Sequence, residues 1–238
     1  FLPREDVLSF EELLRLSQVF VRQGVRRLRI TGGEPLVRRD IGPFFETLGQ
    51  WLQRPEQAGK LDELTLTTNG SLLDVYAETL FKAGVRRVNV SLDTLNEDRV
   101  AQITRRGKLA ATLNGIKAAR AAGLAVRINT VAMAGVNEDE FDALLAWCGS
   151  VGADLCLIET MPMGDTGTDR TASYLPLSKV KTDLAQRWTL TPVPDRTGGP
   201  ARYMRVAETG QRIGFITPMS HNFCGSCNRV RLSCTGRL

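Results

Sequence analysis

Aromatic residues, histidine and long apolar runs are all scarce in this sequence of 238 residues, which has 6% Phe, Trp and Tyr and a single histidine. A membrane-spanning helix needs about 20 consecutive apolar residues, and no run reaches that length. No secretory signal peptide is visible either. We therefore expect a globular cytoplasmic protein, and 42% hydrophobic residues are enough for a sizeable core.

The formal net charge is +5, and the sequence contains four pairs of neighbouring arginines. A nucleic-acid surface would cluster such residues and interleave them with aromatic side chains. Here the pairs are scattered among Asp and Glu. We interpret them as solvated surface, with a nucleic-acid patch as the weaker alternative; the pairs are Arg26/Arg27, Arg38/Arg39, Arg86/Arg87 and Arg105/Arg106.

A unit of helix, glycine and short strand recurs along much of the chain. Successive glycines that close helices are separated by about the length of a βα unit. The glycines are 24, 59, 84, 123 and 152, and the strands that follow them are 27–30, 64–68, 88–92, 126–131 and 155–159. Ser9 and Glu12 form a capping box before the first helix, and Asn137 is the expected N-cap of a helix that contains Phe141, Leu144, Leu145 and Cys148.

Consecutive βα units predict an α/β fold with parallel strands, in either a barrel or a doubly wound sheet. We favour a barrel because every strand, not one pair, ends in polar residues. Residues two apart on a strand share a face, so these side chains form one predicted ring. Its members are Arg29/Thr31, Thr65/Thr67/Asn69, Asn89/Ser91/Asp93, Arg127/Asn129 and Glu159/Met161.

Two arginines of this ring, Arg29 and Arg127, predict an anionic ligand. Guanidinium groups are seldom buried without a partner. Glu159 and Asp93 are one possible set of partners, and a phosphate, which suits the planar guanidinium fork, is the other. No lysine lies on the five strands, which argues against a Schiff-base aldolase.

The first strand ends in the loop Gly32-Gly33-Glu34-Pro35. Glycine lets backbone amides approach a ligand closely because it has no Cβ, and Pro35 restarts the chain in a fixed direction. The loop is therefore a candidate binding site for a small ligand, with an ordinary strand-to-helix turn as the alternative.

Beyond the barrel the composition changes, so we expect a barrel at 1–170 and an extension at 171–238. A short helix capped by Ser178 opens the extension. Residues 191–201 are rich in proline and glycine and predict a linker or a lid. Strands 203–206 and 212–216 then form an expected hairpin around Thr209-Gly210.

Cys224 and Cys227 form a Cys-x-x-Cys pair, which points two thiolates at one metal. The five cysteines are an odd number in a chain without a secretory signal, so reduced thiols are expected rather than disulfides. One pair is half a metal site, and a redox dithiol is the alternative. Cys234 is a possible third ligand, on a strand running from Val230. The lone His221 is left out of the site.

Six segments together resemble the radical S-adenosylmethionine GTP 3',8-cyclase family of molybdenum cofactor biosynthesis. The likeness follows nearly the whole chain in order, in segments 29–40, 67–70, 89–93, 127–131, 159–162 and 222–232. It implies an incomplete parallel βα barrel, with the first strand missing here, and two 4Fe-4S clusters in the intact enzyme.

The resemblance also implies a reaction. In the family, the amino-terminal cluster and S-adenosylmethionine generate a 5'-deoxyadenosyl radical that takes the C3' hydrogen of GTP. The sugar radical attacks C8 of guanine, giving (8S)-3',8-cyclo-7,8-dihydroguanosine 5'-triphosphate. A downstream cyclic pyranopterin monophosphate synthase uses this product. Whether the protein forms a homodimer is left open by the sequence.

Matching positions imply the site residues, with no catalytic residue among them. The residues implied to bind S-adenosylmethionine are Gly32, Gly33, Glu34, Ser91 and Met161. Those implied to bind GTP are Arg29, Thr67, Arg127, Arg229, Val230 and Arg231, and those implied to bind the second cluster are Cys224 and Cys227. The family often has lysine at Arg127, so only its cationic role carries over. The resemblance also implies that Cys234 is not a ligand of the second cluster.

Two departures from the family remain. Its Cys-x-x-x-Cys-x-x-Cys motif would precede Phe1, and the third ligand of the second cluster would follow Leu238. We therefore expect that this stretch alone cannot cleave S-adenosylmethionine. The alternatives are another radical S-adenosylmethionine enzyme with an auxiliary cluster, or a zinc-bearing nucleic-acid-binding module.

Overall fold

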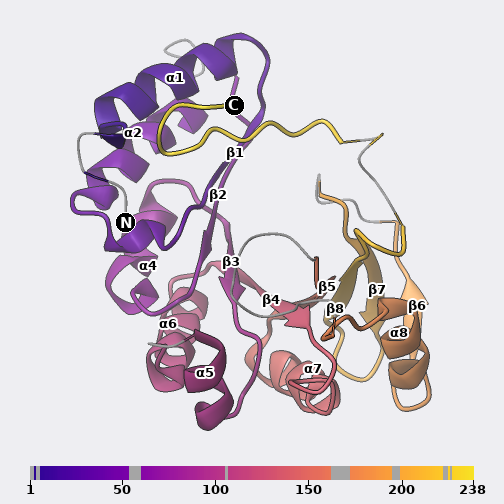
Figure 1. Ribbon diagram of the computed structural model, residues 1–238. Coiled ribbons are helices and arrows are strands. Elements are labelled where there is room, and N and C mark those ends of the chain that lie inside the picture. The colour runs from indigo at the N-terminus through magenta and orange to yellow at the C-terminus, as the bar shows by residue number, and fades with distance from the viewer. Residues whose placement is uncertain are drawn as a thin grey trace. The chain divides into compact units, whose positions relative to one another are not determined.

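The computed structural model describes residues 3, 6–53, 60–104, 107–161, 172–194, 199–221, 225 and 227–238. Its strands are β1 (Arg27–Ile30), β2 (Glu63–Thr68), β3 (Arg87–Ser91), β4 (Ala125–Ala132), β5 (Asp154–Glu159), β6 (Leu190–Pro192), β7 (Arg202–Val206) and β8 (Arg212–Ile216) (Figure 1). The helices are α1 (Phe10–Arg22), the 3₁₀ turn η2 (Pro35–Val37), α2 (Ile41–Gln53), α4 (Leu73–Lys82), α5 (Glu97–Thr104), α6 (Leu109–Ala121), α7 (Phe141–Val151) and α8 (Leu177–Ala185).

The strands follow the order β1-β2-β3-β4-β5-β8-β7-β6. β1 and β2, β4 and β5, and β5 and β8 pair in parallel, whereas β8–β7 and β7–β6 are antiparallel. In the described part of the chain this order ends at β1 and β6, so the sheet is not closed. The predicted α/β class and the incomplete, mostly parallel sheet are confirmed, as are the five predicted strands, to within one residue at either end.

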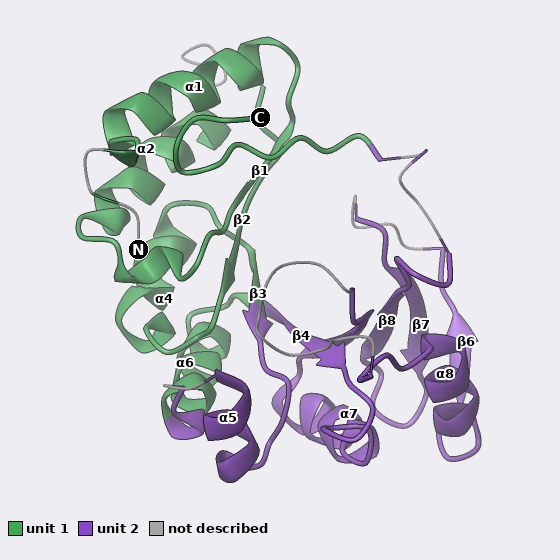
Figure 2. Cartoon of the chain, viewed as in Figure 1, with its two compact units in different colours: residues 1–89, 111–125, 228–238 green, residues 90–110, 126–227 purple. Residues whose placement is uncertain are grey.

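The described chain divides into two compact units (Figure 2). Unit 1 comprises residues 1–89, 111–125 and 228–238, and unit 2 comprises residues 90–110 and 126–227. β3 contributes residues to both. The expected division between a barrel at 1–170 and an extension at 171–238 stays a prediction, because its boundary lies outside the described residues.

Unit 1 has its core between β2 and the helices α2 and α4. The capping box that starts α1 is confirmed: the Ser9 amide donates to Glu12 Oε2 (2.7 Å), and the Glu12 amide donates to Ser9 Oγ (3.1 Å). α2 approaches the end of α4 so closely that a Cβ on Gly49 would lie 2.0 Å from the carbonyl oxygen of Ala83. Only glycine fits at this crossing.

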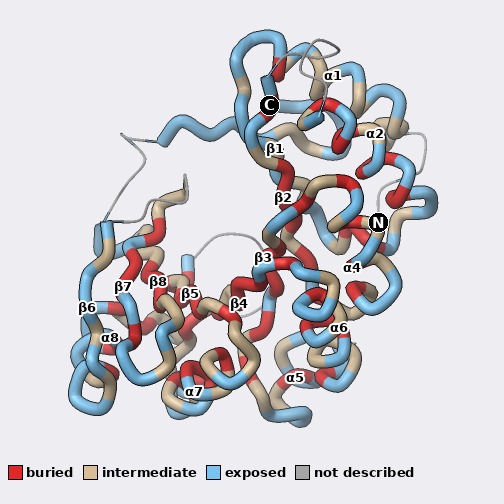
Figure 3. Tube along the Cα trace, turned by 180° about the vertical axis from the view of Figure 1, so that it is seen from behind, coloured by how far each residue is buried: buried red, intermediate tan, exposed pale blue. Residues whose placement is uncertain are grey.

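Unit 2 has its core between the strands and the helices α7 and α8, both of which contact β5. β5 is buried along most of its length, and the burial of the strands is visible in Figure 3. The apolar stripe predicted for α7 is confirmed, since its four residues are 0–4% exposed: Phe141, Leu144, Leu145 and Cys148. The hairpin of β7 and β8 is also confirmed, with Gly210 at φ +72° in its turn.

Asn137 does not cap α7, contrary to prediction, because the helix begins four residues later. Its fully buried amide has another task. Oδ1 accepts from the Met133 amide (2.9 Å), and Nδ2 donates to the carbonyls of Asp93 (2.7 Å) and Val131 (2.9 Å). Asn137 therefore ties the chain beyond β3 to the end of β4.

Two expectations for the extension are also corrected. α8 begins at Leu177 with Pro176 as its N-cap, so Ser178 lies inside the helix. Residues 191–201, predicted as a linker or lid, begin within β6, which pairs with β7. Proline is tolerated in β6 because the strand stands at the end of the described sheet order. None of the described helices has the length and apolar character needed to cross a bilayer.

Candidate functional site

The loop after β1 leaves open space beside its backbone. Gly32 has φ +150°, and a Cβ added to Gly32 or Gly33 would meet no atom within 4 Å. Both glycines are exposed. The loop can therefore admit a ligand close to its amides, as the sequence predicted.

Glu34 fixes this loop to the end of β2. Its Oε1 accepts from the Leu36 amide (3.1 Å) and from Thr68 Oγ1 (2.6 Å), and its Oε2 accepts from the Asn69 amide (2.6 Å). Charge-assisted bonds to a carboxylate are stronger than neutral ones. The carboxylate thus shapes the loop, in addition to any contact it makes with a ligand.

Arg29 shares a face with two threonines of β2. Arg29 is in register with Thr65, and Thr67 stands two residues further along the same face. Asn89 Nδ2 reaches this row and donates to Thr67 Oγ1 at 3.4 Å. The ring is confirmed here, but Arg29 is exposed rather than buried, because β1 stands at the end of the described strand order.

A second charged row on this face was missed from the sequence. Arg87 Nη2 donates to Glu63 Oε1 at 2.6 Å, and Arg27 Nε lies 3.8 Å from Glu63 Oε2. The Arg87 side chain is only 15% exposed, and its Nη1 is buried with no hydrogen-bond partner among the described residues. The interpretation of the arginine pairs as solvated surface is wrong for Arg87. The sequence pattern that could have revealed this charged row is the alternation that places Arg27 and Arg29 on one face of β1.

In unit 2, Arg127 is buried, with 6% exposed, and donates to the hydroxyl of Tyr203 on β7. The Tyr203 ring centroid lies 5.9 Å from the guanidinium carbon of Arg127 and 5.6 Å from that of Arg212. Within about 6 Å a ring face attracts a cation. A Cβ on Gly214 would lie 2.8 Å from the Tyr203 ring, so this glycine makes room for the ring. Glycine inside a strand was the sequence signal for such an approach.

Glu159 lies on the opposite face from Arg127. The register of β4 and β5 pairs Asn129 with Cys156 and Ala132 with Glu159. Arg127 therefore shares a face with Cys156, and Glu159 does not. The predicted ring is wrong at this strand, and so is the expectation of Glu159 as the partner of Arg127, because a register offset of one residue reverses every side chain.

The Glu159 carboxylate instead binds two later segments of unit 2. Oε1 accepts from the Leu177 amide (3.2 Å) and the Ser220 hydroxyl, and Oε2 accepts from the amides of Met219 and Ser220 (both 3.0 Å). The residue is 1% exposed. Burial alone would raise the pKa of Glu159, but the bonds from Ser220, Leu177 and Met219 together outweigh it and hold the pKa below its ordinary value.

Asp93, the other expected partner of the arginines, makes no ion pair with a described residue. Its Oδ1 accepts from the Val131 amide at 2.8 Å. Burial raises the pKa of Asp93, and the bond from Val131 offsets only part of that effect.

The cysteine site is only partly described. Cys227, Arg229, Val230 and Arg231 are exposed, and Cys224 lies outside the described residues. No three His, Cys, Asp or Glu side chains within the described ranges gather as a metal site. A Cys-x-x-Cys motif supplies only part of the donor set of an iron-sulfur cluster, so the second cluster at this accessible cysteine stays a prediction.

Cys234 does not lie on the strand predicted from Val230, because residues 227–233 form no strand. It stands in a turn that is closed by the Ser233 amide donating to the Arg237 carbonyl at 2.7 Å. Its own carbonyl accepts from the Leu8 amide at 2.8 Å. This segment is therefore held against the start of unit 1.

The predicted site residues are divided between the units. Unit 1 contains the glycine loop, Arg29, Thr67 and the segment 229–231; unit 2 contains Ser91, Arg127, Met161 and Cys227. Ser91 and Met161 are both exposed, at the ends of β3 and β5. Within unit 1 the structure places Arg29 and Thr67 on one face. The convergence of residues from the two units stays a prediction.

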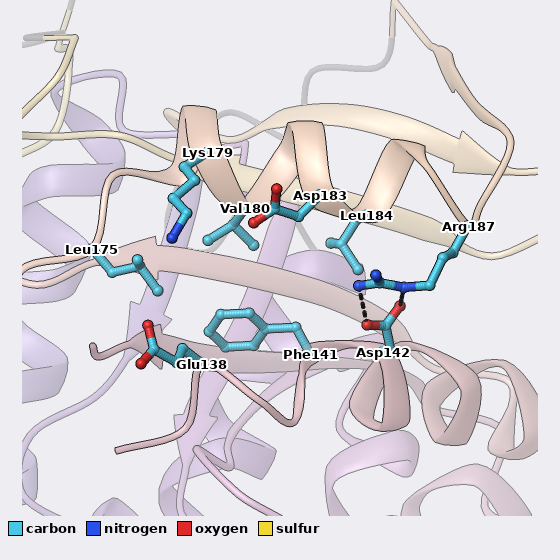
Figure 4. A pocket seen from close by; sticks show the side chains of 9 residues that line it. All are labelled: Glu138, Phe141, Asp142, Leu175, Lys179, Val180, Asp183, Leu184 and Arg187. Atoms are coloured by element: carbon cyan, nitrogen blue, oxygen red, sulfur yellow. Dashed lines mark hydrogen bonds and ion pairs between the residues drawn. The ribbon is translucent and has the colours of Figure 1, made fainter. Parts of the chain in front are cut away.

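A cavity of about 220 Å³ lies between α7 and α8 and contains none of the predicted site residues (Figure 4). Arg187 crosses it to form a bidentate ion pair with Asp142, which Trp188 Nε1 also contacts at 2.9 Å. Its other charged lining residues are Glu138, Lys179 and Asp183. Because the charged side chains that line the cavity are of both signs and partly paired with one another, they do not indicate a particular ligand.

Family comparisons agree with this fold and these motifs. A model described as the Radical SAM superfamily matches residues 1–148, and one described as Molybdenum Cofactor Synthesis C matches residues 153–238. The chain is thus a radical S-adenosylmethionine enzyme of molybdenum cofactor synthesis. That class uses S-adenosylmethionine with a 4Fe-4S cluster.

Relatives narrow the class further. A GTP 3',8-cyclase of Paracoccus denitrificans is 59% identical over 239 residues, covering 100% of this chain and 68% of the relative. Another, from Rhizobium meliloti, is 57% identical over 238 residues and covers 100% and 67%. The chain belongs to the GTP 3',8-cyclase family. The crystal structure of Streptococcus suis SuiB shares the fold, with a TM-score of 0.58, 20% identity, and coverage of 78% of this chain and 39% of that one.

Proposed function

We propose that the complete protein converts GTP to (8S)-3',8-cyclo-7,8-dihydroguanosine 5'-triphosphate in the first step of molybdenum cofactor synthesis. The observation that carries this proposal is the likeness to GTP 3',8-cyclases over the whole chain, at 56–59% identity. The polar face with Arg29 and Thr67, beside a glycine loop with open space, supports it.

The S-adenosylmethionine site would comprise Gly32, Gly33, Ser91 and Met161, with Glu34 fixing the loop. When bound, S-adenosylmethionine and a reduced 4Fe-4S cluster supply the radical that takes the C3' hydrogen of GTP. The chain's task is to orient both molecules. The glycine amides can approach the cofactor without hindrance from a Cβ, and the exposed Met161 offers an adaptable apolar contact.

The GTP site would comprise Arg29, Thr67 and Arg127, with Arg229, Val230 and Arg231 near the second cluster. Arginine forks bind phosphate oxygens in pairs, so these residues would hold the triphosphate. Tyr203 holds Arg127 in place through its hydroxyl and its ring. Cys224 and Cys227 would hold the second 4Fe-4S cluster, with a further ligand from outside this sequence.

The product would pass to a cyclic pyranopterin monophosphate synthase. The test is an anaerobic reaction of the complete, iron-reconstituted protein with S-adenosylmethionine, a reductant and GTP, followed by mass spectrometry. We expect 5'-deoxyadenosine and the cyclised nucleotide in equal amounts. If 5'-deoxyadenosine forms while GTP is unchanged and calorimetry shows no heat of GTP binding, the protein is a different radical S-adenosylmethionine enzyme. Zinc in place of iron would contradict the class itself.

A further inference from the structure

Tyr203 on β7 reaches Arg127 on β4 across the two strands between them, β8 and β5 (Figure 1). The register pairs Tyr203 with Gly214 and Gly214 with Cys156, which shares a face with Arg127. In a flat sheet three strand spacings amount to about 14 Å, so only two long side chains that extend toward each other can meet. The space above Gly214 is what lets the Tyr203 ring lie over β8.

A second arginine restrains the Tyr203 ring. Asp154 Oδ2 accepts from Arg212 Nε (3.1 Å) and Nη2 (2.6 Å), and Asp154 Oδ1 accepts from the Arg212 amide (3.0 Å). The Asp154 side chain is only 16% exposed, so water screens this ion pair only in part. The guanidinium carbon of Arg212 lies 5.6 Å from the centroid of the Tyr203 ring. Asp154 therefore fixes Arg212, and Arg212 limits the positions that the ring can take.

Arg127 is thereby held in one orientation before any ligand binds. Tyr203 and Arg127 are 4% and 6% exposed, and the Tyr203 hydroxyl accepts from Arg127 Nη1. An arginine side chain has many rotamers, and it loses this freedom when it binds a phosphate. Ordering the side chain within the folded protein removes that entropic cost from the binding step.

We propose that Tyr203 is a positioning residue for Arg127: its hydroxyl and ring orient the guanidinium for a phosphate of GTP, and Asp154 with Arg212 holds the ring. This inference deepens the proposed function and rests on its assignment of Arg127 to GTP. Tyr203 does not touch the nucleotide in this proposal. It acts through Arg127, so its effect on the affinity for GTP must disappear when Arg127 is removed.

Tyr203→Phe separates the hydroxyl from the ring, because it removes one oxygen and keeps the packing over Gly214. Interactions within one hydrogen-bond network change an equilibrium by roughly 2- to 100-fold, and for this single hydroxyl we expect the Kd for GTP to rise about 10-fold. The KM for GTP should rise with it. The value of kcat at saturating GTP should stay near that of the wild type, because an interaction that orients a binding group acts on the bound substrate and the transition state alike.

Tyr76 offers a matched control for the loss of a hydroxyl. It lies on α4 in unit 1, beside Gly42 of α2. Tyr76→Phe should therefore leave the affinity for GTP unchanged. Asp154→Asn is a second variant that acts from the other side of the ring, because it removes the charge that fixes Arg212. It should weaken GTP binding in the same direction as Tyr203→Phe and by a smaller factor.

The experiment is a double-mutant cycle on the complete, iron-reconstituted protein. Wild type, Tyr203→Phe, Arg127→Met, the double variant and Tyr76→Phe are each titrated with GTP and with S-adenosylmethionine by calorimetry, and their melting temperatures are measured. We expect Tyr203→Phe to weaken GTP binding in the presence of Arg127 and to have no further effect in the Arg127→Met background. The Kd for S-adenosylmethionine should stay near that of the wild type throughout.

A wild-type Kd for GTP in Tyr203→Phe would overturn the proposal. So would an equal weakening by Tyr203→Phe in both backgrounds, because Tyr203 would then act independently of Arg127. If Arg127→Met alone leaves the Kd for GTP unchanged, the assignment of Arg127 under the proposed function fails and this inference fails with it. That result is distinguishable from the other two, because it is read from the single variant of Arg127.

Discussion

Arg127 on β4 and Glu159 on β5 point to opposite faces of the same pair of neighbouring strands. Arg127 lies with Tyr203 and Cys156, whereas Glu159 holds the start of α8 and the chain beyond β8. The two charges therefore have different contacts: Arg127 binds Tyr203 on β7, and Glu159 binds α8 and the chain beyond β8.

Substitutions of these two residues should be independent. We expect the changes in unfolding free energy of Arg127→Met and Glu159→Gln to add in the double variant to within about 0.5 kcal/mol, as for sites without shared partners. Urea unfolding of the four proteins of the cycle provides the measurement. A coupling above about 1 kcal/mol would mean that the two side chains interact after all.

Gly214→Ala should destabilise the protein, because the new methyl group would meet the Tyr203 ring and approach Cys156 Sγ at 3.4 Å. Overpacking of this kind typically costs about 1–3 kcal/mol. The loss is measured by urea unfolding, with Gly199→Ala as the control, because a Cβ at Gly199 meets no atom within 4 Å. Equal stability of Gly214→Ala and wild type would show that the Tyr203 ring can move away freely.

Because of Asp93, the free energy of unfolding should decrease as the pH rises. Its pKa is raised by burial in the folded protein, so the folded state keeps the proton that the unfolded state releases. Between the unfolded and the folded pKa, the unfolding free energy therefore decreases with increasing pH. Asp93→Asn removes this titration and can retain the bond from the Val131 amide.

We accordingly expect the stability of Asp93→Asn, relative to wild type, to increase from pH 4 towards neutral pH and then to level off. Urea unfolding at a series of pH values measures this difference. A relative stability that declines over the same interval would contradict the assigned direction of the pKa shift.

The four described cysteines should differ in reactivity. Cys148 and Cys156 are 0% exposed, and burial raises the pKa of Cys148, with the Asp154 charge adding to the effect, so its thiolate is scarce. Cys227 and Cys234 are exposed. In reduced, iron-free protein, iodoacetamide should label the exposed pair first, as peptide mass spectrometry would show; labelling in denaturant is the control. Early modification of Cys148 would indicate that the core of unit 2 opens readily.

Arg231→Ala should weaken GTP binding and leave S-adenosylmethionine binding near normal. Arg231 is exposed, and a charge-assisted bond is worth about 1.5–3 kcal/mol, so we expect the Kd for GTP to rise about 10-fold or more. Calorimetry of the complete protein with each ligand measures this. Arg237→Ala, an exposed arginine of the same segment, controls for the loss of charge, and an equal loss of both ligands would point to misfolding.

The strand positions and the capping box at Ser9 could be predicted because they depend on local pattern. The relative register of β4 and β5 could not, since alternation defines two faces of each strand but does not say which face meets which neighbour. This is why Glu159 was placed beside Arg127. The partly buried ion pair of Arg87 with Glu63 was missed for a related reason: a pair of neighbouring arginines looks solvated in the sequence until its cross-strand partner is known.

Asn137 shows a different limit. As an asparagine ahead of an apolar stripe it has the properties of an N-cap, yet the structure uses its amide to join the ends of neighbouring strand segments. Local capping and tertiary bonding compete for the same side chain, and only the tertiary arrangement decides between them. The open backbone of the glycine loop, in contrast, could be predicted, because a residue without a Cβ leaves its amide accessible in any tertiary arrangement.

The bond between the Leu8 amide, ahead of α1, and the Cys234 carbonyl, in a turn of the segment 228–238, joins two parts of unit 1 that are far apart in the sequence. A nascent chain emerges from the ribosome amino terminus first, so Leu8 must wait for its partner until nearly everything between them has been synthesised. The arginines at 229 and 231 belong to the segment that docks in this late event. This docking would therefore fix the position of the segment that carries these two arginines on unit 1.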